Sequence, residues 1–533
     1  MNAITRLGGV VIMNKIFVKT KMHTGKIERD LHGQFIEFLG SGIYDGIWVG
    51  EGSDIPNYEG LRKDVVDALK EIQPPILRWP GGCYADTYHW KKGIGPKNER
   101  PYTFNENFGT EEIENNHFGT HEFMKLCNLV GAKPWFNINM MSGTVEEMND
   151  WAEYCNRPNG TELSEMRIKN GAKEPFNVEY WGIGNESWAG GGTYTAQSYA
   201  DSYRRFASAF PRFGAGLPWS KGQLVPIKLI AVGPDGNKPK ERVEWTKKFF
   251  ESLGDFRQPK LDGYDLHFYN WNMSDSEDTV TEFSEAAWYR VINGAFELEE
   301  IICEQYDLIQ EGIKNIPQTE GPFSSEMHCD LIVGEWGNWH NIQPDSLSVL
   351  WQQCTMRDAL TTALTLDIFH RNSDKVKMAC VAQSVNVLNS LFLTKDAETI
   401  LTPNYHVFNM YKVHQDATRL ECEINTTKVN KYDYEQLNTI YSFASEKDGL
   451  ININVVNVHM TDSINVELGF DQEVEFVSVE TLKSNCVNDC NTFANPKQVV
   501  TSQGANPIFN QKNGIFEIEV PAASVSVYQF KVK

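Results

Sequence analysis

The sequence of 533 residues is poor in positive charge, with 49 Lys and Arg against 71 Asp and Glu and a formal net charge of −22. Proteins that bind nucleic acids neutralise phosphates with Lys and Arg, so this composition argues against a nucleic-acid partner. The sequence also lacks an apolar run of the roughly 20 residues that a membrane-spanning helix needs. We therefore expect neither nucleic acid nor membrane as a partner, and a neutral or weakly charged ligand fits better.

Cysteine motifs are missing as well, although the chain has ten Cys. No C-x-x-C pair occurs, and no cluster of His or Cys accompanies Cys486 and Cys490 to complete a zinc site. The apolar run at residues 7–13 is at the short limit for a signal peptide, and no small-residue cleavage site follows it. These absences predict a protein without metal or other cofactor in a reducing compartment, and we expect it in the cytoplasm.

Two short apolar runs, far apart in the chain, each end in a carboxylic acid. Residues 180–187 contain Asn185 and Glu186 after two small residues, and residues 331–336 contain Glu335 followed by an aromatic residue. The first run alone could be a strand followed by a helix cap, because Asn and Ser are common caps. Two glutamates at the tips of two buried strands indicate instead a pair built to cleave a glycosidic bond.

Short apolar segments alternate with segments of helical periodicity over most of the chain. Strands that alternate with helices form parallel βαβ units, and eight of them predict an α/β fold that closes as a (β/α)8 TIM barrel. An open doubly wound sheet is the alternative, but its first strand would lead into a Gly-rich phosphate loop, which residues 37–40 are not. The predicted strands lie near residues 35, 77, 136, 181, 230, 266, 333 and 380, and the predicted helices include residues 61–72, 120–130, 145–154, 199–210, 243–253, about 275–312 and 347–369.

The pattern changes beyond about residue 416, because all fourteen Trp lie before this point. Segments of period-two alternation follow, separated by Gly, Asn and Pro, and they predict an antiparallel, jelly-roll-like β-sandwich. A strand at residues 16–18, set apart by Gly25, has no place in the barrel, so we expect it to join the sandwich. The predicted domains are a catalytic barrel over residues 30–415 and a sandwich over residues 416–533, joined by the N-terminal strand at residues 14–29.

Polar residues stand at the end of nearly every predicted barrel strand. In such barrels the chemistry sits at the carboxyl ends of the strands, so these residues predict the site. Each one alone has a structural explanation, since Arg78 could form a core ion pair and Gln383 could be a satisfied core amide. Together they favour a carbohydrate site formed by Glu37, Arg78, Asn139, Asn185, Glu186, His267, Tyr269, Glu335 and Gln383.

Motifs in the same order give the chain a family resemblance that spans residues 30 to about 411. The matching stretches are residues 33–40, 43–47, 77–82, 93–96, 118–123, 182–186, 334–336, 382–388 and 402–403 with Tyr405. In these stretches the chain resembles the arabinofuranosidases of glycoside hydrolase family 51. The tail at residues 416–533 matches that family only in its expected architecture.

The resemblance implies a retaining glycosidase that releases terminal non-reducing α-L-arabinofuranosyl residues from arabinoxylan, arabinan or their oligosaccharides. It implies Glu186 as the acid/base and Glu335 as the nucleophile. Many family members are hexamers, so a homo-oligomer is expected. The residues that it implies around the substrate are Glu37, Arg78, Cys83, Asn185, His267, Tyr269 and Gln383, with Trp339, Trp90 and Trp188 on the leaving-group side.

Two other functions stay open at this point. The same machinery could act on another sugar, as an endo-acting glucanase or xylanase, and a long open cleft would favour that alternative. The chain could also be a non-catalytic sugar-binding protein with its tail as a lectin. The tail has no Trp, and aromatic platforms are usual in sugar-binding domains, so the lectin alternative is disfavoured.

Overall fold

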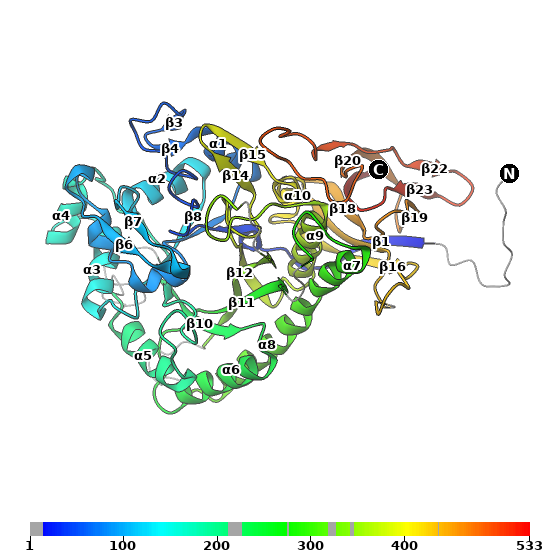
Figure 1. Cartoon of the computed structure of the whole chain (residues 1–533). Helices are drawn as coiled ribbons and strands as arrows, with labels where there is room; N and C mark the ends of the chain where they lie inside the picture. The colour runs from blue at the N-terminus through cyan, green and yellow to red at the C-terminus, as the bar shows by residue number, and fades with distance from the viewer. Residues whose placement is uncertain (1–13, 212–225, 274–276, 318–326, 342–345, 435) are drawn as a thin grey trace.

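A computed structural model of the chain describes residues 14–211, 226–273, 277–317, 327–341, 346–434 and 436–533. A barrel with its helices forms the larger part, and a β-sandwich built mainly from the C-terminal end of the chain lies beside it (Figure 1). The apolar run at residues 7–13 lies outside the described residues. Among the residues that are described, no helix has the length and apolar character needed to cross a membrane.

The predicted closed barrel is confirmed. Its parallel strands hydrogen-bond in the order β10-β11-β12-β13-β2-β5-β8-β9, and β9 pairs with β10 to close the ring. Each predicted barrel strand is found near its expected position. The strands are β2 (Gly33–Phe35), β5 (Ile76–Trp79), β8 (Lys133–Ile138), β9 (Tyr180–Ile183), β10 (Lys228–Asp235), β11 (Gly263–Asn272), β12 (Asp330–His340) and β13 (Val376–Val381).

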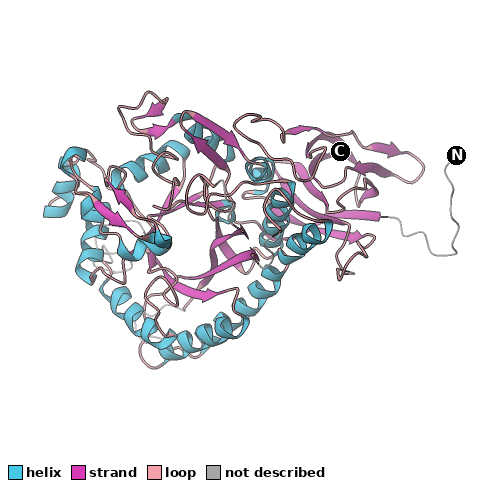
Figure 2. Ribbon diagram, in the orientation of Figure 1, coloured by secondary structure: helices cyan, strands magenta, loops and turns pink. Residues whose placement is uncertain are grey.

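Helices surround the barrel strands (Figure 2). The first, α1 (Lys63–Ile72), buries Val65, Leu69 and Ile72 on one face. Gln73 caps its C-terminal end with a left-handed φ of 55°, and Pro74 follows. The other α-helices are α2 (Thr120–Val130), α3 (Val145–Asn156), α4 (Glu162–Lys169), α5 (Ala196–Ala209), α6 (Pro239–Gly254), α7 (Glu285–Gly294), α8 (Glu297–Lys314), α9 (Met356–Arg371) and α10 (Pro403–Tyr411).

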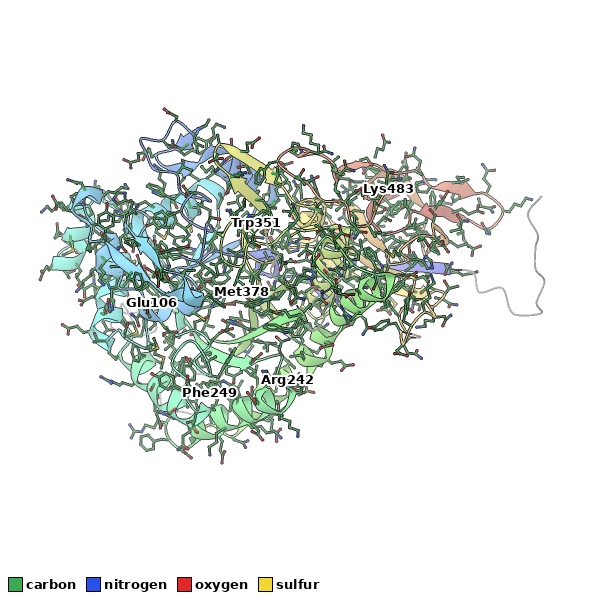
Figure 3. All side chains as sticks on the ribbon, viewed as in Figure 1. Glu106, Arg242, Phe249, Trp351, Met378 and Lys483 are labelled. Atoms are coloured by element: carbon green, nitrogen blue, oxygen red, sulfur yellow. The ribbon has the colours of Figure 1, made fainter. Side chains whose placement is uncertain are left out.

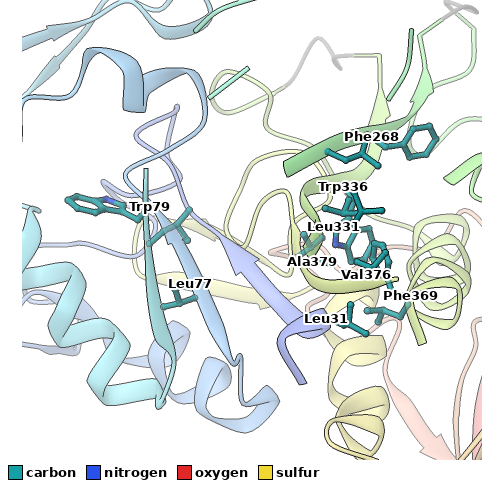
Figure 4. Packing of buried hydrophobic residues seen from close by; sticks show 14 of the residues in the cluster. Leu31, Leu77, Trp79, Phe268, Leu331, Trp336, Phe369, Val376 and Ala379 are labelled. Atoms are coloured by element: carbon teal, nitrogen blue, oxygen red, sulfur yellow. The ribbon is translucent and has the colours of Figure 1, made fainter. Parts of the chain in front are cut away.

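Large aromatic side chains fill the space between the barrel strands and these helices. Trp336 on β12 packs against Phe369 on α9 (Figure 4), and their ring centroids lie 5.5 Å apart. Trp79 on β5 stacks on Phe123 of α2 with centroids 4.9 Å apart. Buried aromatic residues contribute a large share of the hydrophobic free energy of a core. Much of the Trp content of the barrel is therefore structural.

The structure corrects the predicted boundaries of three elements. Helix α9 begins at Met356 rather than at residue 347, because Thr355 and Asp358 form a capping box there. The acidic stretch at residues 275–312 contains two helices, α7 and α8, rather than one. The N-terminal strand β1 (Asn14–Lys26) ends at Lys26 rather than at residue 29.

The sandwich is a ten-stranded sheet in the order β21-β20-β24-β18-β17-β16-β1-β19-β23-β22. Among the described residues its pairings are antiparallel, except that β1 runs parallel to β19. The strands that follow the barrel are β16 (Thr418–Asn425), β17 (Ile440–Lys447), β18 (Leu450–Asn457), β19 (Ile464–Phe470), β20 (Val474–Leu482), β21 (Thr501–Gln503), β22 (Ile508–Asn510), β23 (Ile515–Val520) and β24 (Ser524–Val532).

This sheet folds over onto itself and encloses its own core. Phe470 on β19 and Phe516 on β23 pack against Phe530 on β24, with ring centroids 4.9 Å and 5.1 Å apart, although these strands are well separated in the sheet order. The domain boundary at residue 415 stays a prediction. The position of β1 between β16 and β19 supports the proposal that residues 14–29 complete the sandwich.

Three buried histidines lie where the sandwich meets the barrel. His32, just before β2, and His370 on α9 approach each other with their Nε2 atoms 2.9 Å apart. The His414 ring lies 5.1 Å from the His370 ring, as a centroid distance, and bonds to Ser445 on β17 and Asn454 on β18. Burial lowers the pKa of His32 well below its ordinary value, and lowers the pKa of His370 and of His414 to about 3.

These histidines should make the stability of the fold sensitive to acid. Below the ordinary pKa of about 6.5 the unfolded chain binds protons that the folded chain excludes, so stability is lost as the pH falls. Each buried neutral imidazole adds about 1.4 kcal/mol per pH unit to that loss. We expect the free energy of unfolding of the double variant His32→Leu/His370→Leu, measured in urea, to fall less between pH 6.5 and 5 than that of the wild type. The exposed His328, replaced by Leu, is the control, and equal slopes for all three proteins would contradict the prediction.

Candidate active site

A pocket of about 470 Å³ lies at the carboxyl ends of the barrel strands. Its position agrees with the rule that the strand ends of such barrels carry the chemistry. Most of the residues predicted from the sequence line it, namely Glu37, Cys83, Glu186, Trp188, His267, Tyr269, Glu335, Trp339 and Gln383. Arg78 and Asn185 lie directly behind this lining, where Arg78 bonds to both Glu335 and Asn185.

Glu335 on β12 is buried, with 5% of its surface exposed. The Arg78 guanidinium donates to Glu335 Oε1 at 2.7 Å, and the Tyr269 hydroxyl donates to Oε2 at 2.6 Å. Burial alone would raise the pKa of Glu335, but the charges of His267 and Arg78 outweigh it and hold the pKa below its ordinary value. Glu335 is therefore ionised near neutral pH.

Glu186 follows β9 and faces Glu335 across the pocket. One carboxylate oxygen of each glutamate and one ring nitrogen of His267 lie within 4.8 Å of one another. Burial and the negative charge of Glu335 raise the pKa of Glu186, although the bond from His267 Nδ1 to Glu186 Oε1 at 2.9 Å opposes that rise. The two glutamates thus have opposite shifts in pKa, because Arg78 bonds to Glu335 and not to Glu186, whereas burial and the negative charge of Glu335 dominate at Glu186.

His267 on β11 connects the two glutamates. Its Nδ1 lies 2.9 Å from Glu186 and 3.6 Å from Glu335, and its Nε2 lies 3.1 Å from Asp265 Oδ2. Burial lowers its pKa, but the charges of Glu335 and Asp265 raise it to about 10 overall. The imidazole therefore carries a proton on both nitrogens at neutral pH.

This protonation also bears on metal binding. The described residues offer one cluster that could ligate an ion, formed by Glu186, His267 and Glu335. A metal ligand needs a neutral imidazole with a free lone pair, whereas His267 is a cation that donates from both nitrogens. Arg78 already occupies one oxygen of Glu335. The cluster is better suited to proton transfer than to an ion.

Arg78 on β5 is clamped in place between two aromatic rings. Its guanidinium carbon lies 4.5 Å from the Phe35 ring centroid and 5.0 Å from the Trp135 ring centroid. Its second nitrogen donates to Asn185 Oδ1, and the Asn185 backbone N–H donates to Asp86 Oδ2 at 2.9 Å. One planar guanidinium therefore fixes both the Glu335 carboxylate and the residue next to Glu186.

Glu37 receives four hydrogen bonds. The backbone N–H groups of Gly82 and Tyr84 and the Asn107 amide donate to Oε1, and the Gln383 amide donates to Oε2 at 2.8 Å. Burial and the charge of Glu335 raise the pKa of Glu37 to about 7, against the effect of these donors. Glu37 and Gln383 both line the pocket.

Aromatic rings form the outer side of the pocket. Trp339 packs 5.0 Å from Tyr269 and 5.0 Å from Trp271, and Phe108 lies 6.1 Å from Trp339, as centroid distances. Trp188 also lines the pocket, and its indole donates to the Gly233 carbonyl at 3.0 Å.

Two predicted site residues lie away from the pocket. Trp90 is 1% exposed and stacks on Trp151 in the core, with its indole N–H bonded to the Glu147 carbonyl. The expectation that Trp90 lines the leaving-group side is therefore corrected, because the loop after β5 turns this ring inward. Asn139 bonds to the Tyr88 carbonyl and to Ser142, so it organises a loop instead.

Several pocket residues were missed. Asp265 lies on β11 two residues before His267, and it accepts from the Gly334 N–H at 2.6 Å. Period-two alternation along that strand places Asp265 on the same face as His267, and this signal could have identified it. Phe108 and Trp271 stand in loop and strand-end positions that no periodicity marks, and the same holds for Asp235, Asn237 and Lys238.

Comparisons with known proteins point to one family. A family model described as the alpha-L-arabinofuranosidase 1 domain matches residues 68–287, and one described as the alpha-L-arabinofuranosidase C-terminal domain matches residues 334–524. The intracellular exo-alpha-L-arabinofuranosidase of Bacteroides ovatus is 37% identical over 94% of this chain and 92% of the relative. The crystal structure of the GH51 arabinofuranosidase from Xanthomonas axonopodis pv. citri matches with a TM-score of 0.86 at 32% identity, covering 97% of this chain and 100% of that chain. The chain belongs to the α-L-arabinofuranosidases of glycoside hydrolase family 51.

This arabinofuranosidase is therefore a glycosidase that releases arabinofuranosyl residues from an arabinose-containing substrate. The structure of an alpha-L-arabinofuranosidase from Thermotoga maritima in complex with arabinose is also similar, with a TM-score of 0.79 at 28% identity over 97% of this chain and 100% of that chain. The endo-acting alternative is less supported. A bifunctional glucanase-xylanase structure shares the fold at only 12% identity, with a TM-score of 0.56.

Because Arg78 bonds to both Glu335 and Asn185, we predict that replacing it lowers the activity. Replacing Arg78 by Lys keeps the charge but loses the planar fork that reaches Glu335 and Asn185 together. We expect kcat on an aryl arabinofuranoside to fall about 30- to 150-fold, which corresponds to roughly 2–3 kcal/mol. Arg167→Lys is the matched control, because Arg167 is equally buried but bonds to backbone carbonyls outside the pocket. The control should lose stability rather than kcat, and equal losses of kcat in the two variants would contradict the prediction.

Proposed function

We propose that this enzyme removes terminal arabinofuranosyl residues by double displacement with retention of configuration. Glu335 is the proposed nucleophile and Glu186 the proposed acid/base. The observation that carries the proposal is the approach of their carboxylate oxygens to within 4.8 Å. Retaining enzymes hold the two carboxyl groups about 5–5.5 Å apart, whereas inverting enzymes need roughly 6.5–9.5 Å to admit a water molecule.

In the proposed first step, a carboxylate oxygen of Glu335 forms a bond to the anomeric carbon. The bond from that carbon to the leaving oxygen breaks, and the leaving oxygen takes the proton of Glu186. An arabinosyl ester of Glu335 remains. In the second step Glu186 takes a proton from water, whose oxygen attacks the anomeric carbon and releases Glu335.

The electrostatics of the pocket support this division of roles. Arg78 and His267 keep the pKa of Glu335 low, so it is ionised for attack, while burial and Glu335 itself keep the pKa of Glu186 high. His267 Nδ1 faces Oε1 of Glu186, so the proposed transferable proton lies on Oε2, which Cys83 Sγ contacts at 3.8 Å. Glu37, Tyr269 and Gln383, which line the pocket, and Asn185 behind them are proposed to hold the furanose ring.

The proposed substrates are arabinoxylan, arabinan or their oligosaccharides. The name of the Bacteroides ovatus relative describes it as intracellular and exo-acting, which supports a cytoplasmic enzyme that acts on chain ends or side groups. A homo-oligomer, a hexamer by family resemblance, stays a prediction.

Removal of each glutamate should give a different pattern of loss. Without a nucleophile, Glu335→Ala should lose at least about 10³-fold in kcat/KM on every substrate, including an activated aryl arabinofuranoside. Without a general acid, Glu186→Ala should lose about 10²- to 10⁴-fold on a natural oligosaccharide but far less on an aryl substrate whose leaving group needs no proton. Rates for both variants on both substrates decide the assignment, and equal losses for Glu186→Ala on the two substrates would refute its role as the acid.

Removing the cation between the glutamates should move the pH profile. His267→Gln deletes a charge that lowers the pKa of Glu335 and a hydrogen bond that lowers the pKa of Glu186. Both pKa values should rise, so the bell-shaped profile of kcat/KM should shift to higher pH on both limbs. His89→Gln is the control, because His89 bonds to Glu147 outside the pocket. A profile that stays in place, or moves to lower pH, would show that the proton on His267 does not govern the pair.

A further inference from the structure

The short 3₁₀ helix η2 (Cys83–Thr87) follows β5 and reaches Glu186 at two levels. Its first residue, Cys83, contacts the side chain of Glu186, with Sγ 3.8 Å from Oε2. Its fourth residue, Asp86, accepts a hydrogen bond from the backbone N–H of Asn185 at 2.9 Å. Asp86 is fully buried, and burying a carboxyl group is unfavourable unless hydrogen bonds replace the lost water. None of the roles proposed above uses this residue.

The hydrogen bonds of Asp86 come from the ends of two barrel strands. Its Oδ1 accepts from the backbone N–H of Met140 at 2.8 Å, and its Oδ2 accepts from that of Asn185. Its backbone carbonyl accepts from the N–H of Ser142 at 3.3 Å. Met140 and Ser142 follow β8, and Asn185 follows β9. Asp86 therefore joins the loop after β5 to the carboxyl ends of β8 and β9.

The chain after Asn185 forms a turn with an unfavourable backbone conformation. Glu186 has a φ of 39°, in the left-handed region that residues with a side chain rarely adopt. Its carbonyl accepts from the N–H groups of Ala189 and Gly191 at 2.8 Å and 3.1 Å. A Cβ added at Gly191 would lie 1.7 Å from the Asn185 carbonyl oxygen and 2.8 Å from Asp86 Oδ2. The turn therefore folds back onto the Asp86 carboxyl group, and a strained conformation of this kind persists only where surrounding contacts hold it.

Part of this turn is exposed. Ala189 and Gly190 are exposed and line a hollow of about 520 Å³ together with residues of η2. The hairpin of β6 (Thr103–Asn105) and β7 (Glu112–Glu114) borders the same hollow with Phe104 and with Glu106, which is labelled in Figure 3. Because the turn faces open space there, its position depends on the residues that do contact it, and Asp86 is one of them.

We propose that Asp86 is a positioning residue that fixes the orientation of Glu186 through the backbone of Asn185. This inference rests on the proposed role of Glu186 as the acid. The proton must pass from Glu186 to the leaving oxygen, and such a transfer requires the two oxygens to lie within hydrogen-bonding distance. Asp86 lines neither the pocket nor the hollow, so it acts through Glu186 rather than on the substrate.

Loss of this support should affect the two glutamates unequally. Glu335 is held by hydrogen bonds from Arg78 and Tyr269, and these bonds do not involve Asp86. Without the Asp86 carboxyl group we expect the turn to shift, so that Glu186 moves relative to the leaving oxygen while Glu335 stays in place. The reaction then slows most where the leaving group depends most on the proton.

The test measures kcat/KM on aryl arabinofuranosides whose leaving phenols differ in acidity. Asp86→Asn keeps the shape of the side chain but turns an NH₂ group toward one of the two backbone N–H groups. For a weakly acidic phenol, which needs the proton, we expect kcat/KM to fall about 10- to 100-fold. For a strongly acidic phenol the loss should stay below about 3-fold. Asp367→Asn is the matched control, because Asp367 is also buried but bonds to Asn454 outside the pocket, and any loss it shows should be equal across the series.

A double variant shows whether the effect passes through Glu186. In Glu186→Ala the carboxyl group that Asp86 positions is gone, so adding Asp86→Asn should lower kcat/KM for the weakly acidic phenol by less than about 2-fold. Independent effects would multiply instead. If Asp86→Asn does not fold, Asp86→Glu replaces it, because Glu keeps the carboxyl group on a longer arm that displaces the turn and should give the same dependence on the leaving group.

The outcomes separate this inference from the function on which it rests. A loss that grows as the phenol becomes less acidic, and that disappears in the Glu186→Ala background, supports the positioning role. An equal loss across the series, or losses that multiply in the double variant, shows that Asp86 supports only the fold, and the arabinofuranosidase assignment stands. If Glu186→Ala itself loses activity equally on all phenols, the proposed acid role is wrong and this inference fails with it.

Discussion

The site depends on holding two glutamates whose pKa values shift in opposite directions a few ångströms apart in a buried pocket. Taking carboxylates out of water is costly unless cations and hydrogen bonds compensate for the lost solvation. Arg78 and His267 supply those cations, and their positions are unequal. Of the two glutamates, Arg78 bonds only to Glu335, while His267 bonds to Glu186 and Asp265 and lies slightly farther from Glu335. This asymmetry contributes to the opposite shifts in pKa of two chemically identical side chains.

The barrel fixes these cations by packing them tightly. Arg78 is buried and held between the rings of Phe35 and Trp135. Glycine permits the close approach of strands around the charges. A Cβ added at Gly334 would lie 2.3 Å from Asp265 Oδ1, and one at Gly82 would lie 2.7 Å from Glu335 Oε1. The motifs that surround the glutamates in the sequence therefore combine charge with small residues for steric reasons.

Much of the barrel and the pair of glutamates could be predicted from the sequence, because periodicity marks strands and the carboxyl ends of strands mark the site. The prediction fails where the direction of a loop decides the outcome. Trp90 and Trp188 are both aromatic residues in loops after strands, yet Trp90 packs into the core and Trp188 faces the pocket. Phe104 and Phe108 belong to a hairpin whose approach to Glu186 is a tertiary contact, and no local pattern encodes it. The parallel pairing of β1 with β19 is likewise set by the fold of the whole sandwich.

The charges in the pocket stabilise the positive charge that would develop on the sugar during the reaction more than they stabilise the neutral bound sugar. Next to the two glutamates, Arg78 and His267 carry two positive charges and Glu335 and Asp265 carry two negative ones, and these four charges balance. In the proposed mechanism, positive charge develops on the sugar ring as the leaving group departs, beside the ionised Glu335. Glu37, whose pKa is raised to about 7, is partly ionised near neutral pH and adds negative charge at the same ring. The electrostatic stabilisation therefore grows along the reaction, which is the condition for catalysis rather than for tight substrate binding.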